Sequence, residues 1–363
     1  MIKQAAPTPN EHVKEAINRV LESGMYVKGP EAEEFEKKFE SISGCKYNIA
    51  VNSGTSALNL ILLAFDYPAE SEIIVPVNTF MASGNVVETS NYNVKFADVD
   101  YKTMNIDTKN LETLISAKTK AIMVVHLFGQ PVNMDEVMQV ANKRGIDVIE
   151  DACQAHGATY KNQKIGSIGK ISSFSLFPTK NLSVLGDGGM VSTNDTELAD
   201  RIRSLRNAGR QDNPDNAKYF GFNMRLSEIL AAIGNAMLET FEEDLRKRQD
   251  LAEGYNSYLA DLPEIELPFV IPESTAVWHQ YTIKTDRRDE LKEFLKHHAI
   301  QSSVKYSIPL HLVDSFQQKY GHQEGDFPMG ERTTNSWLCL PMHPLLTDDD
   351  IQNISLKIKE FFK

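Results

Sequence analysis

The feature that most constrains the fold is the alternation of short apolar segments with amphipathic segments along the first half of the chain. The segments that this pattern predicts to be strands are residues 47–51, 72–75, 94–97, 121–125 and 148–151. Strands that alternate with helices of ordinary length predict an α/β fold, with a mostly parallel sheet covered by helices on both faces. Ligands of such sheets bind beyond the carboxyl ends of the strands. Residues that directly follow these segments are therefore candidates for a functional site.

The amphipathic segments predict where the helices lie. Apolar residues at helical spacing predict helices over 11–23, 31–41, 133–143, 196–205, 226–259 (one helix or two), 288–298 and 348–362. Gly24 is a helix stop and Asn133 a helix cap. Residues 281–283 and 302–306 are expected to be extended, and the polar segment 209–219 to be a mobile loop.

The length of the chain predicts more than one domain. A chain of 363 residues exceeds the size at which a single core usually stops growing. The pattern changes to shorter strands and helices after about residue 262. We expect a large domain over 1–245 and a smaller C-terminal α+β domain over 246–363, bridged by the long helical segment.

Charge and residue usage exclude several classes of protein. A net charge of -12 argues against general nucleic-acid binding, which needs basic surface. Three cysteines far apart in the chain argue against a disulfide framework and against a zinc site. No apolar run is long enough for a membrane span, and the first ten residues lack a signal-peptide pattern. We therefore expect a cytoplasmic protein with no metal site and no membrane partner.

Lys180 stands in a turn between two extended segments. The segment 173–175 breaks at Pro178, and the glycine-rich segment 186–189 precedes a second extended segment at 190–193. A lysine held between two strands is a candidate for covalent chemistry, because its amine can form an imine with an aldehyde. The alternative is a solvated loop lysine with no such role.

Asp151 follows an apolar strand, 29 residues before Lys180. A carboxylate at that edge of the sheet can hold a proton on a cationic heterocycle; alternatively, Asp151 only caps the next turn. If both residues flank one pocket, they supply what pyridoxal 5'-phosphate requires: an amine for the aldehyde and an acid for the pyridine nitrogen. A lysine partly desolvated beside a cationic ring has a lowered pKa and can serve as a base.

Two further segments fit parts of the same cofactor. Ser53-Gly54-Thr55-Ser56 opens a predicted helix, where free amide groups and the helix dipole favour a phosphate. The alternative is a plain N-cap formed by Ser53 or Thr55. Phe80 follows another strand exit and could stack on a ring, or it could be a core phenylalanine at the start of a helix.

Four motifs together carry a resemblance to a known family. They are Asn52-Ser53-Gly54-Thr55-Ser56-Ala57-Leu58, Glu150-Asp151-Ala152-Cys153-Gln154-Ala155-His156-Gly157, the segment from Ser173 through Lys180 to Gly189, and Gly221-Phe222-Asn223-Met224-Arg225-Leu226. In this order they resemble the DegT/DnrJ/EryC1/StrS family. That resemblance implies a fold-type I, pyridoxal-phosphate-dependent aminotransferase acting mostly on nucleotide-linked keto sugars.

The resemblance also implies roles for individual residues. Lys180 would hold the cofactor covalently and shuttle the proton, Asp151 would pair with the pyridine nitrogen, and Gln154 would face the ring hydroxyl. Phe80 would stack on the cofactor ring. The phosphate would be held by Thr55, Ser56 and Ser175, and Asn223 would reach it from a neighbouring subunit. A homodimer with shared active sites is therefore expected. Arg225, Tyr306 and His311 lie in stretches that bear on substrate.

The expected reaction is amino transfer from glutamate to a nucleotide-linked keto sugar, with the 3-keto and 4-keto forms both open. Asp187 stands at a position where many 4-keto enzymes of the family that this chain resembles look to have glutamate. The aspartate is a hint of a 3-keto substrate. Transfer to a cyclitol ketone is an alternative. A pyridoxamine-dependent sugar dehydratase is another, although that branch replaces the lysine that this chain keeps as Lys180. A cofactor-binding regulatory protein without turnover is the alternative from outside the enzymes.

Overall fold

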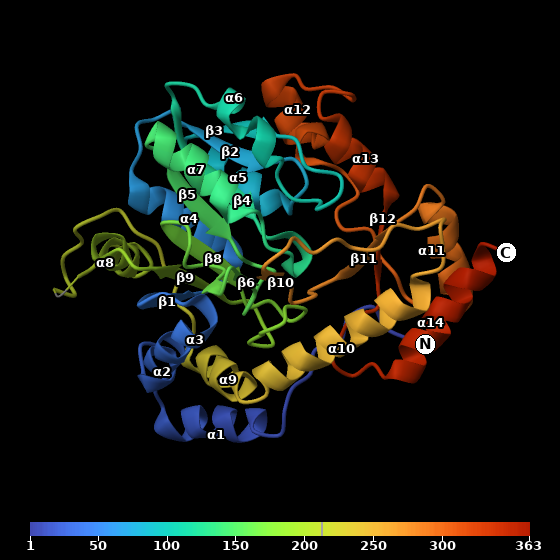
Figure 1. Ribbon diagram of the computed structural model, residues 1–363. Coiled ribbons are helices and arrows are strands. Elements are labelled where there is room, and N and C mark those ends of the chain that lie inside the picture. The colour runs from blue at the N-terminus through green and yellow to red at the C-terminus, as the bar shows by residue number, and fades with distance from the viewer. Residues whose placement is uncertain (212) are drawn as a thin grey trace.

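The fold is built around a seven-stranded sheet in the order β1-β9-β8-β5-β4-β2-β3, in a computed structural model that describes residues 1–211 and 213–363 (Figure 1). Its strands are β1 Tyr47–Val51, β2 Glu72–Pro76, β3 Asn93–Ala97, β4 Thr119–Val125, β5 Asp147–Asp151, β8 Ile171–Ser175 and β9 Gly189–Thr193. β9 pairs antiparallel with both its neighbours, whereas β8, β5, β4, β2 and β3 are parallel. The predicted mostly parallel sheet is confirmed.

Both faces of the sheet are covered, because successive strand residues point to opposite sides and apolar residues lie on both sides. In β2, Ile74 joins one core, whereas Ile73 and Val75 join the other. The first core also takes α1 Val13–Ser23, α2 Pro30–Lys38, α7 Met134–Arg144 and α9 Glu228–Leu238. The second takes α4 Gly54–Phe65, α5 Met81–Thr89 and α8 Thr196–Leu205. The sheet is therefore the middle one of three layers, with helices on both of its faces, as expected.

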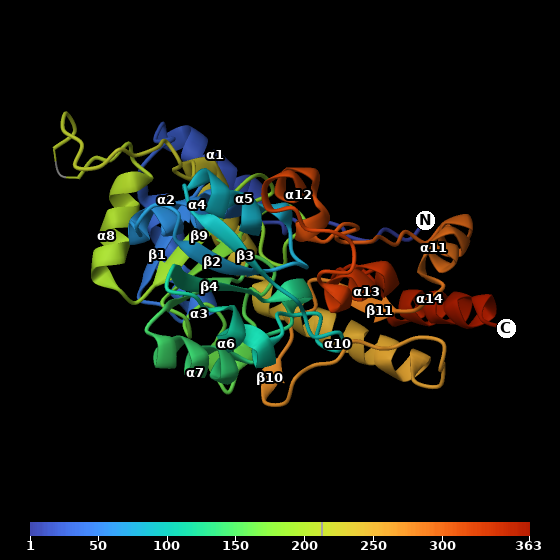
Figure 2. The ribbon, with the colours of Figure 1, turned by 90° about the horizontal axis from the view of Figure 1, so that it is seen from above.

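A third core lies beyond the sheet, around the short pair of antiparallel strands β11 Tyr281–Lys284 and β12 Trp337–Leu340. It is covered by α10 Phe241–Leu259, α11 Arg288–His297 and α14 Asp348–Phe361. Figures 1 and 2 place both chain termini at this end, where Ile2 pairs with Ile300. The predicted domain boundary at residue 245 falls within α10 and stays a prediction.

Shorter elements connect these parts. They are the helices α3 Glu40–Ser43, α6 Leu111–Leu114, α12 Asp314–Tyr320 and α13 Pro328–Ser336, and the 3-10 turns Thr108–Asn110, Leu127–Gly129 and Leu310–Leu312. A small sheet joins β6 Thr159–Tyr160 to β7 Gln163–Lys164 and β10 Ser274–Thr275. No described helix is long and apolar enough to cross a membrane.

Some sequence predictions of single elements are wrong. The helix predicted over 31–41 is divided into two at Phe39, although the backbone of this residue keeps right-handed helical angles. Its buried ring packs edge-on against Phe35 and Phe174. The segment 302–306 forms no strand in the structure; Ser303 alone makes a bridge, to Cys339. Gly24 does end α1 in the left-handed conformation, with φ 67°. In the predicted loop 209–219, residue 212 lies outside the described residues.

Candidate active site

Asp151 is the last residue of β5, at the carboxyl edge of the sheet. It pairs in register with Val125, the last residue of β4, and with Ser173 in the middle of β8. The side chain is buried; its Oδ2 accepts a hydrogen bond from Ser83 Oγ at 2.8 Å. Its Oδ1 accepts from the Cys153 amide at 3.2 Å, so the expected turn-capping role also holds. One carboxylate oxygen thus fixes the turn, and the other is held by a hydroxyl from α5.

Lys180 lies in the turn that follows β8, close to that carboxylate. Its amide donates to the Phe177 carbonyl at 2.9 Å, which fixes the turn. Burial lowers the Lys180 pKa, and the charge of Lys305 lowers it further, whereas Cys153 and Asp151 act in the opposite direction. These charges act on one another only because the groups lie near each other. The geometry does not fit the alternative of a fully solvated loop lysine.

The N-terminus of α4 faces the end of β8. Ser53 is the N-cap and its Oγ accepts from the Ser56 amide at 3.0 Å, so the N-cap alternative is correct for Ser53. Thr55 is exposed. A Cβ on Gly54 would lie 2.8 Å from Ser175 Cβ, so only glycine allows the helix terminus to approach Ser175 this closely. The first turn of the helix and Ser175 therefore converge on one position, which fits a phosphate group.

Three side chains gather at the opposite end of the site. Phe80 is the N-cap residue of α5, and its ring is 46% exposed although it is apolar. Its centroid lies 5.5 Å from that of Tyr306, whose hydroxyl accepts from Gln154 Nε2 at 3.2 Å. Gln154 Oε1 accepts from the Phe128 amide at 2.7 Å, which fixes the orientation of its amide group. Phe80 is thus available to a ligand and is not the core residue of the alternative reading.

Taken together, these residues fit pyridoxal phosphate. The chain supplies an amine with a lowered pKa at Lys180, a buried carboxylate at Asp151, and an exposed aromatic face at Phe80. The close approach of Gly54 to Ser175 leaves a space at the N-terminus of α4, here called the cradle, that a Cβ on residue 54 would fill. The assignment of each residue to a part of the cofactor stays a prediction.

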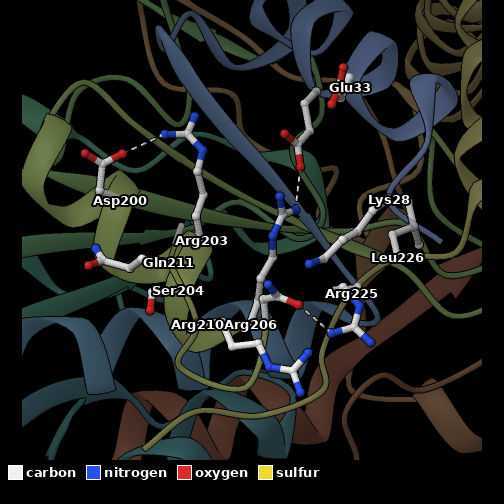
Figure 3. A pocket seen from close by; sticks show the side chains of 12 residues that line it. Lys28, Glu33, Asp200, Arg203, Ser204, Arg206, Arg210, Gln211, Arg225 and Leu226 are labelled. Atoms are coloured by element: carbon white, nitrogen blue, oxygen red, sulfur yellow. Dashed lines mark hydrogen bonds and ion pairs between the residues drawn. The ribbon is translucent and has the colours of Figure 1, made fainter. Parts of the chain in front are cut away.

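A separate basic cavity of about 530 Å³ lies beside α8 and the segment that carries Arg225. Figure 3 shows Lys28, Arg206, Arg210 and Arg225, which come from separate stretches of chain, grouped around it. Arg206 pairs with Glu36, and Arg203 pairs with Asp200 at 3.1 Å.

Three of the cations in this basic cavity have no carboxylate partner among the described residues: Lys28, Arg210 and Arg225. Arg225 donates to Asn207 Oδ1 at 2.8 Å. The pKa of Lys28 is lowered by burial and then by the charges of Arg225, Arg210 and Arg206. An excess of positive charge in one cavity favours an anionic ligand.

Two predicted residues lie apart from the cluster of Lys180 and Asp151. Asn223 is exposed, and its backbone pairs with that of Asn207 at the basic cavity. His311 is buried, with its Nε2 3.0 Å from Glu331 Oε1 and its ring packed against Phe327. The predicted roles of both residues stay predictions.

Sequence reasoning missed several residues of the site. Ser83 orients Asp151 from α5, Lys28 and Arg210 line the basic cavity, and Lys305 acts on Lys180. Two buried imidazoles also lie near Lys180; burial and then the Lys180 charge lower the pKa of His156 to about 3, and that of His279 is lowered as well. Of these residues, only His156 lies in a motif that the sequence analysis singled out, the segment Gln154-Ala155-His156-Gly157.

Comparison with known proteins gives a consistent picture. A family model described as the DegT/DnrJ/EryC1/StrS aminotransferase family matches residues 7–359. The dTDP-3-amino-3,6-dideoxy-alpha-D-galactopyranose transaminase of Aneurinibacillus thermoaerophilus is 38% identical over 344 residues, which are 95% of this chain and 93% of that protein. The UDP-2-acetamido-2-deoxy-3-oxo-D-glucuronate aminotransferase of Pseudomonas aeruginosa is 35% identical over 344 residues, 95% of this chain and 94% of that protein.

Solved structures agree with these sequence matches. DesV of S. venezuelae, in complex with a ketimine intermediate, superposes with a TM-score of 0.93 at 36% identity. The match covers 96% of this chain and 94% of that one. The fold expected from the sequence motifs is therefore confirmed over nearly the whole chain.

Proposed function

The chain belongs to the DegT/DnrJ/EryC1/StrS aminotransferase family, and from that premise we propose that it moves the amino group of glutamate to a nucleotide-linked keto sugar. The single observation that carries the proposal is the cluster at the carboxyl edge of the sheet. There the turn of Lys180, the buried Asp151 and the N-terminus of α4 converge. An amine, an acid and a phosphate cradle in one place serve a pyridoxal-phosphate enzyme.

Each residue of the cluster has a definite task in this proposal. The amine of Lys180 would hold the cofactor and would supply the group that moves a proton at the reacting carbon. Asp151, whose carboxylate is held by Ser83, would pair with the pyridine nitrogen and hold its proton. When bound, pyridoxal phosphate supplies an electron sink for negative charge at the reacting carbon. Phe80 covers the ring, and Gln154 faces the ring hydroxyl.

The phosphate of the cofactor has its own set of residues in the proposal. Thr55, Ser56 and Ser175 surround the N-terminus of α4, where the helix dipole favours a dianion. Asn223 completes the set from a second copy of the chain, so the enzyme is a homodimer with shared sites. The exposure of Asn223 supports this, as does the complete exposure of the nearby Phe220, at 102%.

The keto sugar brings a diphosphate, for which the basic cavity offers cations. Lys28, Arg210 and Arg225 have no carboxylate partner among the described residues, and Arg225 lies two residues from Asn223. In the proposed dimer these cations serve the same shared site as Asn223. The names of both curated relatives given above specify position 3 of the sugar. We therefore propose a 3-keto substrate, in keeping with Asp187 in the glycine-rich turn.

The other candidate reactions have less support. A dehydratase of this fold lacks the lysine, whereas Lys180 is present here. No feature of the described site favours a cyclitol over a nucleotide-linked sugar, and the basic cavity favours the latter, because only the latter carries a diphosphate. The same proposal includes a cytoplasmic location, where nucleotide-linked sugars are substrates.

A spectroscopic titration tests the proposal. The protein loaded with pyridoxal phosphate is titrated with glutamate, and the visible absorbance of the bound cofactor should decrease and then return when a dTDP-linked 3-keto sugar is added. Lys180→Ala should show neither change, while Lys118→Ala, a control at a 66% exposed lysine, should behave as the parent chain. Full transamination by Lys180→Ala would refute the assignment of the lysine.

A further inference from the structure

Lys305 is a second lysine at the candidate active site. Two hydrogen bonds between the backbones of Ser303 and Cys339, of 3.1 and 2.9 Å, attach its segment to the edge of β12. The next residue, Tyr306, reaches Gln154 and Phe80 at the ring end of the site. The segment that carries Lys305 is therefore fixed at both ends. This places the lysine in the cluster and not on a free loop.

The ammonium group of Lys305 has no ion pair and no hydrogen bond within the described part of the chain. The contrast with Lys284 in the same C-terminal region is informative. Lys284 is buried more deeply than the half-buried Lys305, and its Nζ donates to the Tyr101 carbonyl at 2.7 Å and lies 3.6 Å from Glu266. A partly desolvated ammonium without a partner is costly, and an anionic ligand would offset that cost.

The charges around Lys305 indicate the sign of that ligand. Burial lowers the pKa of Lys305, and its charge contributes to the lowered pKa of Lys180 and of the nearby His279. The carboxylate of the cluster, Asp151, already accepts hydrogen bonds from Ser83 and Cys153. The site thus has an excess of positive charge next to the reacting amine, which an anion would balance.

The two proposed substrates differ in where they carry negative charge. In the keto sugar, the diphosphate is separated from the reacting carbon by the sugar ring, and Lys28, Arg210 and Arg225 offer it a separate set of cations. In an amino-acid donor, a carboxylate is bonded to the reacting carbon itself. Lys305 lies on the segment whose next residue, Tyr306, contacts Gln154 and Phe80 at the candidate active site, so it is placed for the donor and not for the nucleotide.

We propose that Lys305 is a specificity-determining residue that binds a carboxylate of the amino donor. This inference rests on the proposed aminotransferase function and adds a residue to it. Hydrogen bonds between an ammonium and a carboxylate are the stronger kind, so removing one should weaken donor binding by about 10- to 100-fold. Binding of the sugar should be affected little, because its anion lies at the basic cavity.

The test separates the two half-reactions. Lys305→Gln, Lys305→Arg and the parent chain are loaded with pyridoxal phosphate, and cofactor absorbance reports conversion by glutamate or L-alanine. The pyridoxamine form is then assayed with the keto sugar alone. Lys296→Gln, at a 72% exposed lysine of α11, is the matched control. Calorimetric titration of each loaded variant with glutarate adds a binding measurement that needs no turnover.

We expect Lys305→Gln to raise the glutamate concentration for half-maximal conversion and the glutarate dissociation constant at least about tenfold. Lys305→Arg should restore part of the loss, and the sugar half-reaction should change less than about twofold. An equal effect with L-alanine assigns the carboxylate next to the amine; an effect with glutamate alone assigns the side-chain carboxylate.

Two results would overturn the proposal: unchanged glutamate and glutarate constants in Lys305→Gln, or a loss confined to the sugar half-reaction. Failure of the proposed function has a different signature, because the parent chain itself would then not respond to glutamate. In that case the glutarate dissociation constants of Lys305→Gln and of the Lys296→Gln control still show whether Lys305 binds a carboxylate.

Discussion

Gly54→Ala isolates the cradle at the N-terminus of α4 from the rest of the site. The new Cβ would lie 2.8 Å from Ser175 Cβ, 3.1 Å from Cys153 Sγ and 3.2 Å from Ser175 Cα. The first of these distances is about 0.6 Å short of the lower limit of ordinary contact, 3.4 Å, and backbone of β8 is among the atoms that must move. Overpacking of this kind costs roughly 1–3 kcal/mol.

Part of that strain is offset because alanine is the better helix former, by up to about 1 kcal/mol. The net loss in the free energy of unfolding should therefore be about 1–2 kcal/mol. The movement opens the cradle, so the dissociation constant of pyridoxal phosphate should rise at least about tenfold, which corresponds to the loss of about 1.4 kcal/mol. Urea denaturation of the apoprotein measures the first quantity, and an absorbance titration with the cofactor measures the second.

Gly254→Ala is the matched control for this substitution. Gly254 lies inside α10, and its added Cβ would meet Ile351 at 3.4 Å and Asp348 at 3.5 Å, which are ordinary contacts. This variant should be more stable by up to about 1 kcal/mol, with unchanged cofactor affinity. If Gly54→Ala bound the cofactor as tightly as Gly254→Ala does, the phosphate would not lie at this helix terminus.

Other substitutions test the remaining parts of the account. Asp151→Asn should slow the single-turnover reaction with glutamate by roughly 100-fold or more, since it removes the charge that holds the ring nitrogen protonated; an unchanged rate would contradict that role. Lys180→Met should stabilise the apoprotein near pH 7, because the folded chain lowers the pKa of this lysine and so binds its proton more weakly than the unfolded chain. That gain should shrink as pH rises toward 10.5, the ordinary lysine value, when urea denaturation is repeated at each pH. Thr347→Ala should cost about 1 kcal/mol in the same assay without changing activity, because it removes the capping box of α14.

The parts of the fold that the sequence predicts well depend on neighbouring residues. The strand ending in Asp151 is centred on the apolar pair Val148-Ile149, and Gly24 ends α1 because a left-handed residue is easiest for glycine. Phe39, where the predicted helix is divided, packs instead against Phe174, which is far away in the chain. Nothing in the local pattern around Phe39 distinguishes one helix from two.

The same distinction applies to the site. Lys180, Asp151 and the start of α4 lie directly after strands, so their place at the carboxyl edge follows from the topology. Lys305 reaches that edge from the C-terminal region, through the pairing of Ser303 with Cys339. Lys28 and Arg210 meet Arg225 only in the folded chain. Their charges are ordinary in the sequence and become informative only once their partners, or the absence of partners among the described residues, are known.

The most direct test of the central claim is the product of a complete reaction. The loaded protein is incubated with glutamate and a dTDP- or UDP-linked 3-keto sugar, and the sugar and amino-acid products are identified by mass spectrometry. We predict a 3-amino sugar and 2-oxoglutarate in equal amounts, and neither product from Lys180→Ala. A deoxygenated sugar without an amino group, or amino-sugar formation that persists in Lys180→Ala, would contradict the account.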